Sequence, residues 1–237
     1  MLVDGRLTAA AIDVASAQSM TLAGSIYASG NAVFDAAQSM VLRGDVYADG
    51  ALTLHASSLD QAGTTHAGGD LSVDAANITT SGTLDAGNDL ILKAGTASLA
   101  GRVQAARDVR ADIAGTLSQA AAIVAARDAA VHAVRVDGAK GSALSAGHDL
   151  ALSVSQDIAS AGSLYAGNVL AFDAGSFSQT GDGQVNADGA LTLAVAGALD
   201  SAGAIVGGHG LDVHAGSLNS TGQLGSTAGD VSLVTDV

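Results

Sequence analysis

The stretch AQSMTLAGSIYASG at residues 17–30 returns as AQSMVLRGDVYADG at residues 37–50. The two copies place apolar, small and turn-forming residues in the same order, at a distance of 20 residues. A return at a fixed distance indicates a repeat architecture when it continues along the chain. The fold is therefore decided by whether the step of about 20 residues is maintained.

The turn that closes each copy, at Gly30 and Gly50, recurs to the end of the chain. The equivalent residues are Gly69, Asn88, Arg107, Arg127, His148, Asn168, Gly189, His209 and Gly229. Gly5 in VDGRL resembles one more such turn at an irregular distance. We call this column the turn position. Because Gly and Asn tolerate positive φ, we expect the turn position to adopt a left-handed backbone conformation.

Apolar residues stand at fixed offsets from the turn position. Alanine occupies the site two residues before it in most copies, and Leu, Val or Phe stand two and four residues after it. Apolar and polar residues alternate within each copy, which is typical of half-buried strands. Stacked copies would bring equivalent residues about 4.8 Å apart as continuous ladders. The sequence predicts an all-β parallel β-helix of 11–12 coils, roughly 55 Å long, with Met20 and Met40 pointing inward.

Other repeat folds do not fit these columns. Helical solenoids need a 3.6-residue period and longer repeats, hexapeptide helices need a six-residue beat, and calcium-binding nonapeptide rolls need Gly-Gly-x-Gly-x-Asp runs. Residues 100–145 are the weakest stretch, because Ala replaces Leu there. Residues 136–148 and 178–189 predict coils with an extra residue or two at a corner. We expect one β-helix domain over residues 1–237, as a fragment of a longer protein.

Composition excludes several functional classes. The chain has 31 Gly, no Pro, Cys or Trp, and a formal net charge of −14. An acidic surface disfavours nucleic acid and other polyanions as partners. The absence of Cys removes disulfides and Cys-zinc sites. No apolar run is long enough to predict a transmembrane helix.

An aspartate follows the turn position in five consecutive copies: Asp70, Asp89, Asp108, Asp128 and Asp149. Stacked carboxylates could bind cations, but a solvated outer face beside a turn is the simpler interpretation. We expect no metal site and little stabilisation by calcium. The His residues are scattered over different columns, too far apart to share a metal.

Five residues are candidate ligand contacts. Arg107 and Arg127 stand beside the aspartate column, where they either balance its charge or form a patch for carbohydrate or phosphate. Tyr27 and Tyr47 share an outward column, one coil apart, and either bind a sugar ring or pack across the ladder. Lys140 lies in one of the enlarged corners. No catalytic, cofactor-binding or phosphate-loop motif is present.

One sequence pattern recurs along the chain, Gly-x-Leu-x-Ala-Gly-x-x-Leu-x-Leu, as in SGTLDAGNDLILKAG and AGSLYAGNVLAFDAG. This pattern resembles the haemagglutinin repeats of filamentous haemagglutinin-like exoproteins. That family includes contact-dependent inhibition proteins and uses two-partner secretion. The resemblance covers residues 24–233. It implies a right-handed β-helix in an extracellular stalk on a Gram-negative outer surface, exported by an outer-membrane transporter. It also implies roles in adhesion, biofilm or toxin delivery.

Three functions remain open. The first is a structural stalk that projects a distal adhesive or toxic domain, and the second is a binding module for a host receptor, a glycan or a sister filament. The third, a polysaccharide-acting β-helix enzyme, is disfavoured because the corners offer no loops long enough to build a cleft. We therefore expect no enzyme activity and no cofactor. Uncapped strand edges at both ends predict end-to-end self-association.

Overall fold

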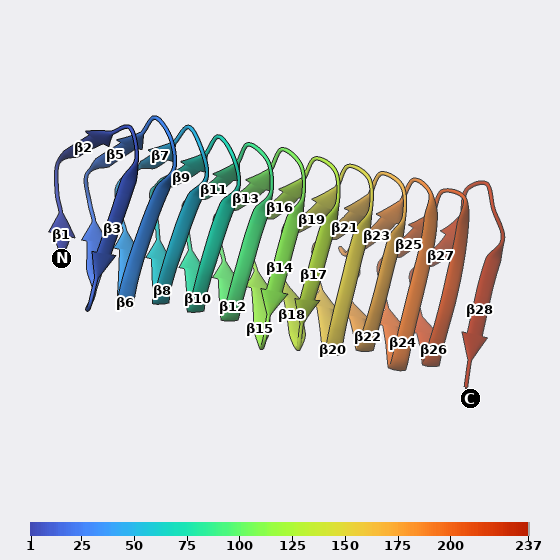
Figure 1. Ribbon diagram of the computed structural model, residues 1–237. Helices are drawn as coiled ribbons and strands as arrows, with labels where there is room; N and C mark the ends of the chain where they lie inside the picture. Colours follow the sequence, from blue (N-terminus) through green and yellow to red (C-terminus); the bar gives the residue numbers. More distant parts are fainter. Residues whose placement is uncertain (237) are drawn as a thin grey trace.

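The computed structural model describes residues 1–236, which form an elongated stack of coils and contain strands but no helix (Figure 1). The strands belong to two parallel sheets that run along the stack. The first and last coils lie at opposite ends. This confirms the predicted all-β parallel β-helix, with about twelve turns of about 20 residues.

One sheet consists of short strands and supplies one strand per coil; we call it the short-strand sheet. Its strands, in spatial order, are β2 (Arg6–Ala9), β5 (Ser25–Ala28), β7 (Val46–Ala48), β9 (Thr64–Ala67), β11 (Thr83–Ala86), β13 (Arg102–Ala105), β16 (Ala122–Ala125), β19 (Ala143–Ala146), β21 (Ser163–Ala166), β23 (Gln184–Ala187), β25 (Ala204–Gly207) and β27 (Gln223–Ser226).

The other sheet, the long-strand sheet, forms the rest of each coil. Its strands are β1 (Leu2–Val3), β3 (Ile12–Ser16), β4 (Met20–Leu22), β6 (Ala32–Leu42), β8 (Leu52–Gln61), β10 (Leu71–Thr80), β12 (Leu90–Leu99), β14 (Val109–Ile113), β15 (Thr116–Gln119), β17 (Ala129–Ala133), β18 (Arg135–Gly138), β20 (Leu150–Ser160), β22 (Leu170–Gln179), β24 (Ala190–Ser201), β26 (Gly210–Ser220) and β28 (Val231–Thr235).

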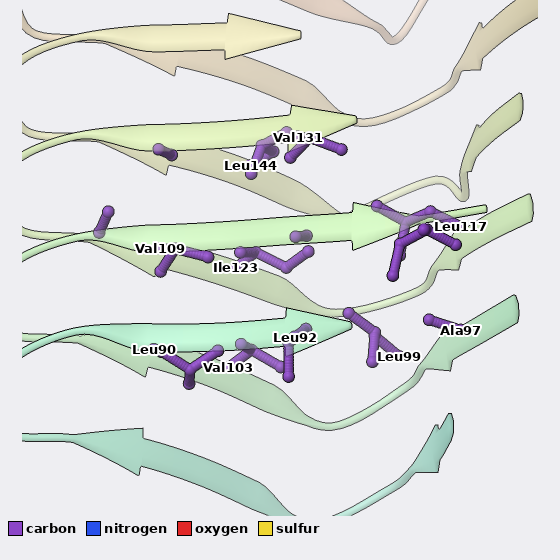
Figure 2. Close-up of a cluster of buried hydrophobic side chains, with 14 of the residues drawn as sticks. Leu90, Leu92, Ala97, Leu99, Val103, Val109, Leu117, Ile123, Val131 and Leu144 are labelled. Atoms are coloured by element: carbon purple, nitrogen blue, oxygen red, sulfur yellow. The ribbon is translucent and has the colours of Figure 1, made fainter. Parts of the chain in front are cut away.

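The register places equivalent residues of successive copies side by side. Leu52, Leu71 and Leu90 form one such ladder and are fully buried, as are the predicted inward residues Met20 and Met40. Figure 2 shows the same arrangement in the middle of the rod, where leucine, valine and isoleucine from both sheets fill the space between them. Burying each such side chain contributes about 1.5–3 kcal/mol, so many small contacts replace the absent large aromatic ones.

The Ala-rich stretch contains two split strands. Neighbouring coils carry one continuous long strand, such as β12, whereas this stretch carries two shorter ones, β14 with β15 and β17 with β18. The breaks fall at residues 114–115 and at residue 134. Each break coincides with a one-residue change of register between neighbouring coils: Ala94 pairs with Ile113, but Ala97 pairs with Leu117.

The turn position does not adopt the predicted left-handed conformation. Positive φ occurs only at Gly5, Gly141 and Gly210 among the described residues, and none of these is a turn-position residue. The prediction was wrong because backbone hydrogen bonds between coils continue through this corner, and they form without positive φ at these residues. The amide of Arg107, for example, donates to the carbonyl of Asn88, and that of Arg127 donates to Arg107.

A second corner, which precedes each short strand, is built from glycine; we call it the glycine corner. Its residues are Gly5, Gly24, Gly44, Gly63, Gly82, Gly101, Ala121, Ser142, Gly162, Gly183, Gly203 and Gly222. A β-carbon added at Gly82 would overlap the carbonyl oxygen of Gly63 one coil below. Glycine is needed here because adjacent coils meet backbone to backbone. Gly5 is thus a turn, as expected, but of this corner.

Two residues of this corner are not glycine, Ala121 and Ser142. After Ala121, strand β16 pairs with β13 only from Ile123 onward, so the first residue pair of that ladder is missing. After Ser142, strand β19 pairs with β16 in full, from Ala143 onward.

Buried polar side chains reinforce the glycine corner from inside. Gln61 is fully buried, and its amide donates to the carbonyls of Gly63 (2.5 Å) and Thr83 (3.0 Å). The hydroxyl of Thr80 in turn donates to the Gln61 side-chain oxygen at 2.5 Å. Gln119 and Gln179 repeat this contact in later coils of the same column. These side chains satisfy carbonyl groups that the corner would otherwise leave buried and unpaired.

Both predicted enlarged corners are present as tight turns. The amide of Ser142 donates to the carbonyl of Ala139 at 3.0 Å, and the amide of Gly183 donates to Thr180 at 2.9 Å. At the ends of the rod, Leu2, Val231, Leu233 and Val234 are exposed apolar residues. End-to-end association through them stays a prediction.

Candidate functional site

The five-residue aspartate column lies at the corner where the short-strand sheet passes into the long-strand sheet; we call it the aspartate corner. The direction of the backbone ladder changes here: the amide of Asn88 donates to Gly69 in the preceding coil, whereas the amide of Leu90 donates to Asp108 in the next coil. The amide of Asp89, which lies between these two residues, has no backbone acceptor in the ladder. The aspartate one coil below supplies a side-chain oxygen instead.

This contact is repeated from coil to coil. Asp70, Asp89, Asp108 and Asp128 each accept the backbone amide of the next aspartate, at 3.1–3.3 Å, and Asp149 accepts that of Val169 at 3.1 Å. The column is therefore more than a solvated face, which was the sequence-based interpretation. Each carboxylate satisfies a main-chain donor that would otherwise be unpaired.

Arginines from the turn position neutralise this column. Arg107 donates to both carboxylate oxygens of Asp89, with Nε at 2.6 Å from Oδ1, and Arg127 does the same to Asp108, with Nε at 2.8 Å. The Arg107 guanidinium holds the pKa of Asp89 below its ordinary value. Of the two interpretations of these arginines, charge balance is the one the geometry supports; their contact with a ligand stays a prediction.

His148 continues the series one coil further on. Its Nδ1 lies 3.2 Å from Oδ1 of Asp128 and 3.3 Å from Oδ2 of Asp149. These three side chains could hold a metal ion, a grouping that column analysis of His residues alone missed. The desolvation of Asp149 opposes ionisation, but hydrogen bonds from the Val169 amide and Asn168 outweigh it and lower its pKa.

The tyrosines lie on the outer face of the short-strand sheet. Tyr27 and Tyr47 are register neighbours, as predicted. The Tyr27 hydroxyl donates to Asp49 at 2.5 Å, which raises its pKa, and Tyr165 makes the same contact with Asp188 at 2.6 Å. The hydroxyl of Tyr27 is therefore already occupied within the protein.

Tyr47 instead begins a polar row that crosses the next three coils. Its ring centroid lies 6.0 Å from that of His66, whose Nδ1 lies 2.7 Å from Asp85. Gln104 donates to the other oxygen of Asp85 at 2.7 Å. Packing across the ladder, the second interpretation of these tyrosines, describes this row; sugar binding by it stays a prediction.

Lys140 is paired across an intervening coil. Its Nζ donates to Asp182 at 2.8 Å, so the two enlarged corners are tied together over Ala161 and Gly162. The contact raises the pKa of Lys140 and lowers that of Asp182. Both side chains are largely exposed, and such a pair contributes little to stability.

A large hollow of the surface lies on the long-strand sheet, away from all five predicted residues. It is a groove of about 850 Å³ that runs along the rod across six coils, from Asp74 to Asp173. The strands bend here: in β10, Ala75 is buried and the next two residues both face outward. Small residues, including Ala76, Gly95 and Ala114, form its floor. Sequence reasoning missed the groove, although this column of small residues was visible.

These features define a class of protein: a parallel β-solenoid with about 20 residues per turn, short corners and surface charges paired between coils. Within that class, the chain belongs to the haemagglutinin repeat family, whose model matches residues 4–44, 47–133, 104–167, 129–195 and 178–235. The resemblance found in the sequence is thereby confirmed. No curated protein and no solved structure matches the chain. The described residues contain no helix able to cross a membrane.

Proposed function

We propose that this chain is a rigid stalk segment of an adhesin-type bacterial exoprotein, which projects distal adhesive or toxin domains from the outer cell surface. The observation that carries the proposal is the unbroken stack of the short-strand sheet from β2 to β27, in which every coil pairs with the next. Membership of the haemagglutinin repeat family supports an adhesin-type role. A uniform stack of this kind holds its two ends at a fixed distance from each other, and it needs no ligand to do so.

Export and location follow from the same proposal. We infer secretion by a partner outer-membrane transporter, in keeping with the two-partner secretion typical of this family. A chain without Cys can thread across an oxidising compartment without forming disulfides. A catalytic role is not proposed, because the corners hold tight turns rather than the long loops from which a cleft could be built.

The proposal is tested by shortening the stalk by whole coils in the bacterium that produces the protein. Deleting residues 64–101 joins Gly63 to Arg102 and removes two coils without changing the register of any column. We expect normal surface display, a shorter projection by immuno-electron microscopy, and retained distal activity. The control deletion of residues 64–91 joins two half-coils out of register and should abolish display.

The outcome that overturns the stalk is specific. If the in-register deletion preserves display yet eliminates adhesion, the deleted coils carry the binding themselves. That result would favour the second function, a binding module whose side face engages a host receptor or glycan. An unchanged projection length in the in-register variant would equally contradict the stalk.

A further inference from the structure

At the aspartate corner, the turn-position side chain lies between the carboxylates of two successive coils. Arg127 donates to both oxygens of Asp108, and its Nε lies 3.1 Å from Oδ2 of Asp128. His148 takes the same place one coil further on, between Asp128 and Asp149. Arginine carries a permanent positive charge and several N–H donors, whereas a neutral imidazole has one N–H and no charge. The change from arginine to histidine therefore leaves two carboxylates without a cation between them whenever the imidazole is neutral.

His148 presents one and the same nitrogen to both carboxylates. Its Nδ1 lies 3.2 Å from Oδ1 of Asp128 and 3.3 Å from Oδ2 of Asp149. This nitrogen carries at most one proton, which cannot point at both oxygens. The three side chains are between 40 and 57% exposed, so an ion from the solvent can reach the space between them.

The distances at His148 fit a small metal ion. Zinc binds imidazole nitrogen and carboxylate oxygen at about 2.0–2.2 Å, so two ligand atoms on one ion lie about 3.0 Å apart in octahedral and about 3.4 Å apart in tetrahedral coordination. Both nitrogen–oxygen distances fall within this range. Ligand atoms of all three residues lie within 4.8 Å of one another, so a small rotation of an exposed carboxylate completes the set. An ion can thus replace the proton between the same atoms.

Neighbouring groups hold the ligands in place. Oδ1 of Asp149 accepts from Nδ2 of Asn168 at 2.8 Å and from the Val169 amide at 3.1 Å, which leaves Oδ2 directed at His148. Oδ1 of Asp128 accepts the Asp149 amide at 3.1 Å and keeps a second lone pair for an ion. Metal binding at Nδ1 requires the imidazole proton on Nε2. That atom lies 3.4 Å from Nδ2 of Asn168, too far to hold the ring in the other tautomer.

We propose that Asp128, His148 and Asp149 bind one divalent transition-metal ion of the zinc type, which joins two successive coils. The imidazole ligand favours such an ion over calcium, which takes about six to eight oxygen ligands. The ion occupies the place that the Arg127 guanidinium holds one coil earlier. The sequence-based expectation of no metal site did not bring one histidine together with two aspartates. The inference is independent of the stalk role, because a stalk needs no metal ion.

The test is titration calorimetry of the full chain, without an affinity tag, with zinc chloride at neutral pH. We expect one zinc ion per chain and much weaker binding of calcium chloride. His148→Arg rebuilds the arrangement of Arg127 and should therefore fold, yet it should weaken zinc binding at least about tenfold, since changing even an outer partner of a metal ligand typically costs about 10–100-fold. Asp149→Asn should weaken binding as well, while it keeps an oxygen for the Val169 amide.

The matched control is His55→Arg. The His55 side chain is 57% exposed, as is that of His148, but it faces one carboxylate, that of Asp35, at 2.8 Å. This variant should bind zinc like the parent. Zinc should also raise the melting temperature of the parent and of His55→Arg, but not that of His148→Arg, because an ion that binds the folded state stabilises it.

Several outcomes overturn the proposal. Absence of saturable zinc binding at millimolar concentration would do so, as would equal affinity of the parent and His148→Arg. Several weakly bound ions per chain, reduced alike by His148→Arg and His55→Arg, would show that surface histidines bind zinc without a defined site. Calcium binding as tight as zinc binding would contradict the role of the imidazole. Circular dichroism of each variant establishes that a loss of binding is not a loss of fold.

Discussion

At the glycine corner, neighbouring coils lie so close that a β-carbon has no room, whereas at the aspartate corner side chains of the aspartates supplement the backbone hydrogen bonds between coils. The first corner accepts almost no residue but glycine along the whole chain, while the turn position at the second is Gly, Asn, Arg or His in different coils. Both corners keep adjacent coils in register. The difference teaches that steric contact fixes residue identity far more strictly than hydrogen bonding does.

The largest effect is expected for a methyl group added at the glycine corner. Gly82→Ala places a β-carbon on the carbonyl of Gly63 and forces the two coils apart, which should lower the free energy of unfolding by about 3 kcal/mol. Urea denaturation measures the loss. Gly225→Ala is the matched control, because no atom lies within 4 Å of its added β-carbon. Equal stability of the two variants would contradict the steric account of this corner.

The next effect concerns the buried amide that supports the same corner. Gln61→Leu leaves the carbonyls of Gly63 and Thr83 without their side-chain donor, and should cost about 2 kcal/mol. A leucine fits the space, because Leu42 and Leu99 occupy this column in other coils. Thermal unfolding of this variant should be compared with that of Gln18→Leu, which changes an exposed glutamine. A neutral result would mean that water replaces the amide.

A smaller effect is expected at the aspartate corner. Asp108→Ala removes both the acceptor for the Asp128 amide and the partner of Arg127, and should cost about 1 kcal/mol. Asp108→Asn keeps an oxygen for the amide and should cost about half as much. Urea denaturation of both variants separates the two contributions. If the Asn variant were as unstable as the Ala variant, the ion pair rather than the main-chain contact would dominate.

The smallest effect is a loss of stability in acid. The pKa values of Asp89, Asp149 and Asp182 are lowered in the folded protein, so the unfolded chain binds protons first as the pH falls. Their contribution is complete above the ordinary aspartate pKa of about 4 and is lost as the pH falls below it. Melting temperatures between pH 2 and 7 should show this decline. Arg107→Gln should make the decline shallower; an unaltered profile would rule out Asp89 as a contributor.

The sequence predicted the coil step, the inward columns and the enlarged corners, because each of these depends only on period and hydrophobicity. Met20 and Met40 were placed correctly since alternation decides which face is buried. The two corners were harder. A glycine in the sequence can reflect positive φ or the close approach of a neighbouring coil. The turn position at Gly50 was assigned positive φ, which the structure does not show there.

The candidate sites were predicted less well, for a physical reason. Tyr27 and Lys140 were chosen as possible ligand contacts, yet each proves to be engaged with an aspartate of another coil. Arg107 makes the charge-balancing contact that was one of its two predicted roles. Whether a polar side chain is free depends on which residue lies one or two coils away. The hollow that runs from Asp74 to Asp173 likewise becomes apparent only once the coils are stacked.

The hydrogen bonds between coils all point along the long axis of the rod, because the coils stack in that direction. A pull spread over the whole cross-section is therefore resisted by every bond between two coils at once. A pull through the chain itself detaches an end strand bond by bond. One detached coil releases about 20 residues, or roughly 65 Å of extended chain. A tether that sheds a single coil thus gains more length than this whole rod possesses, while the remaining coils stay folded.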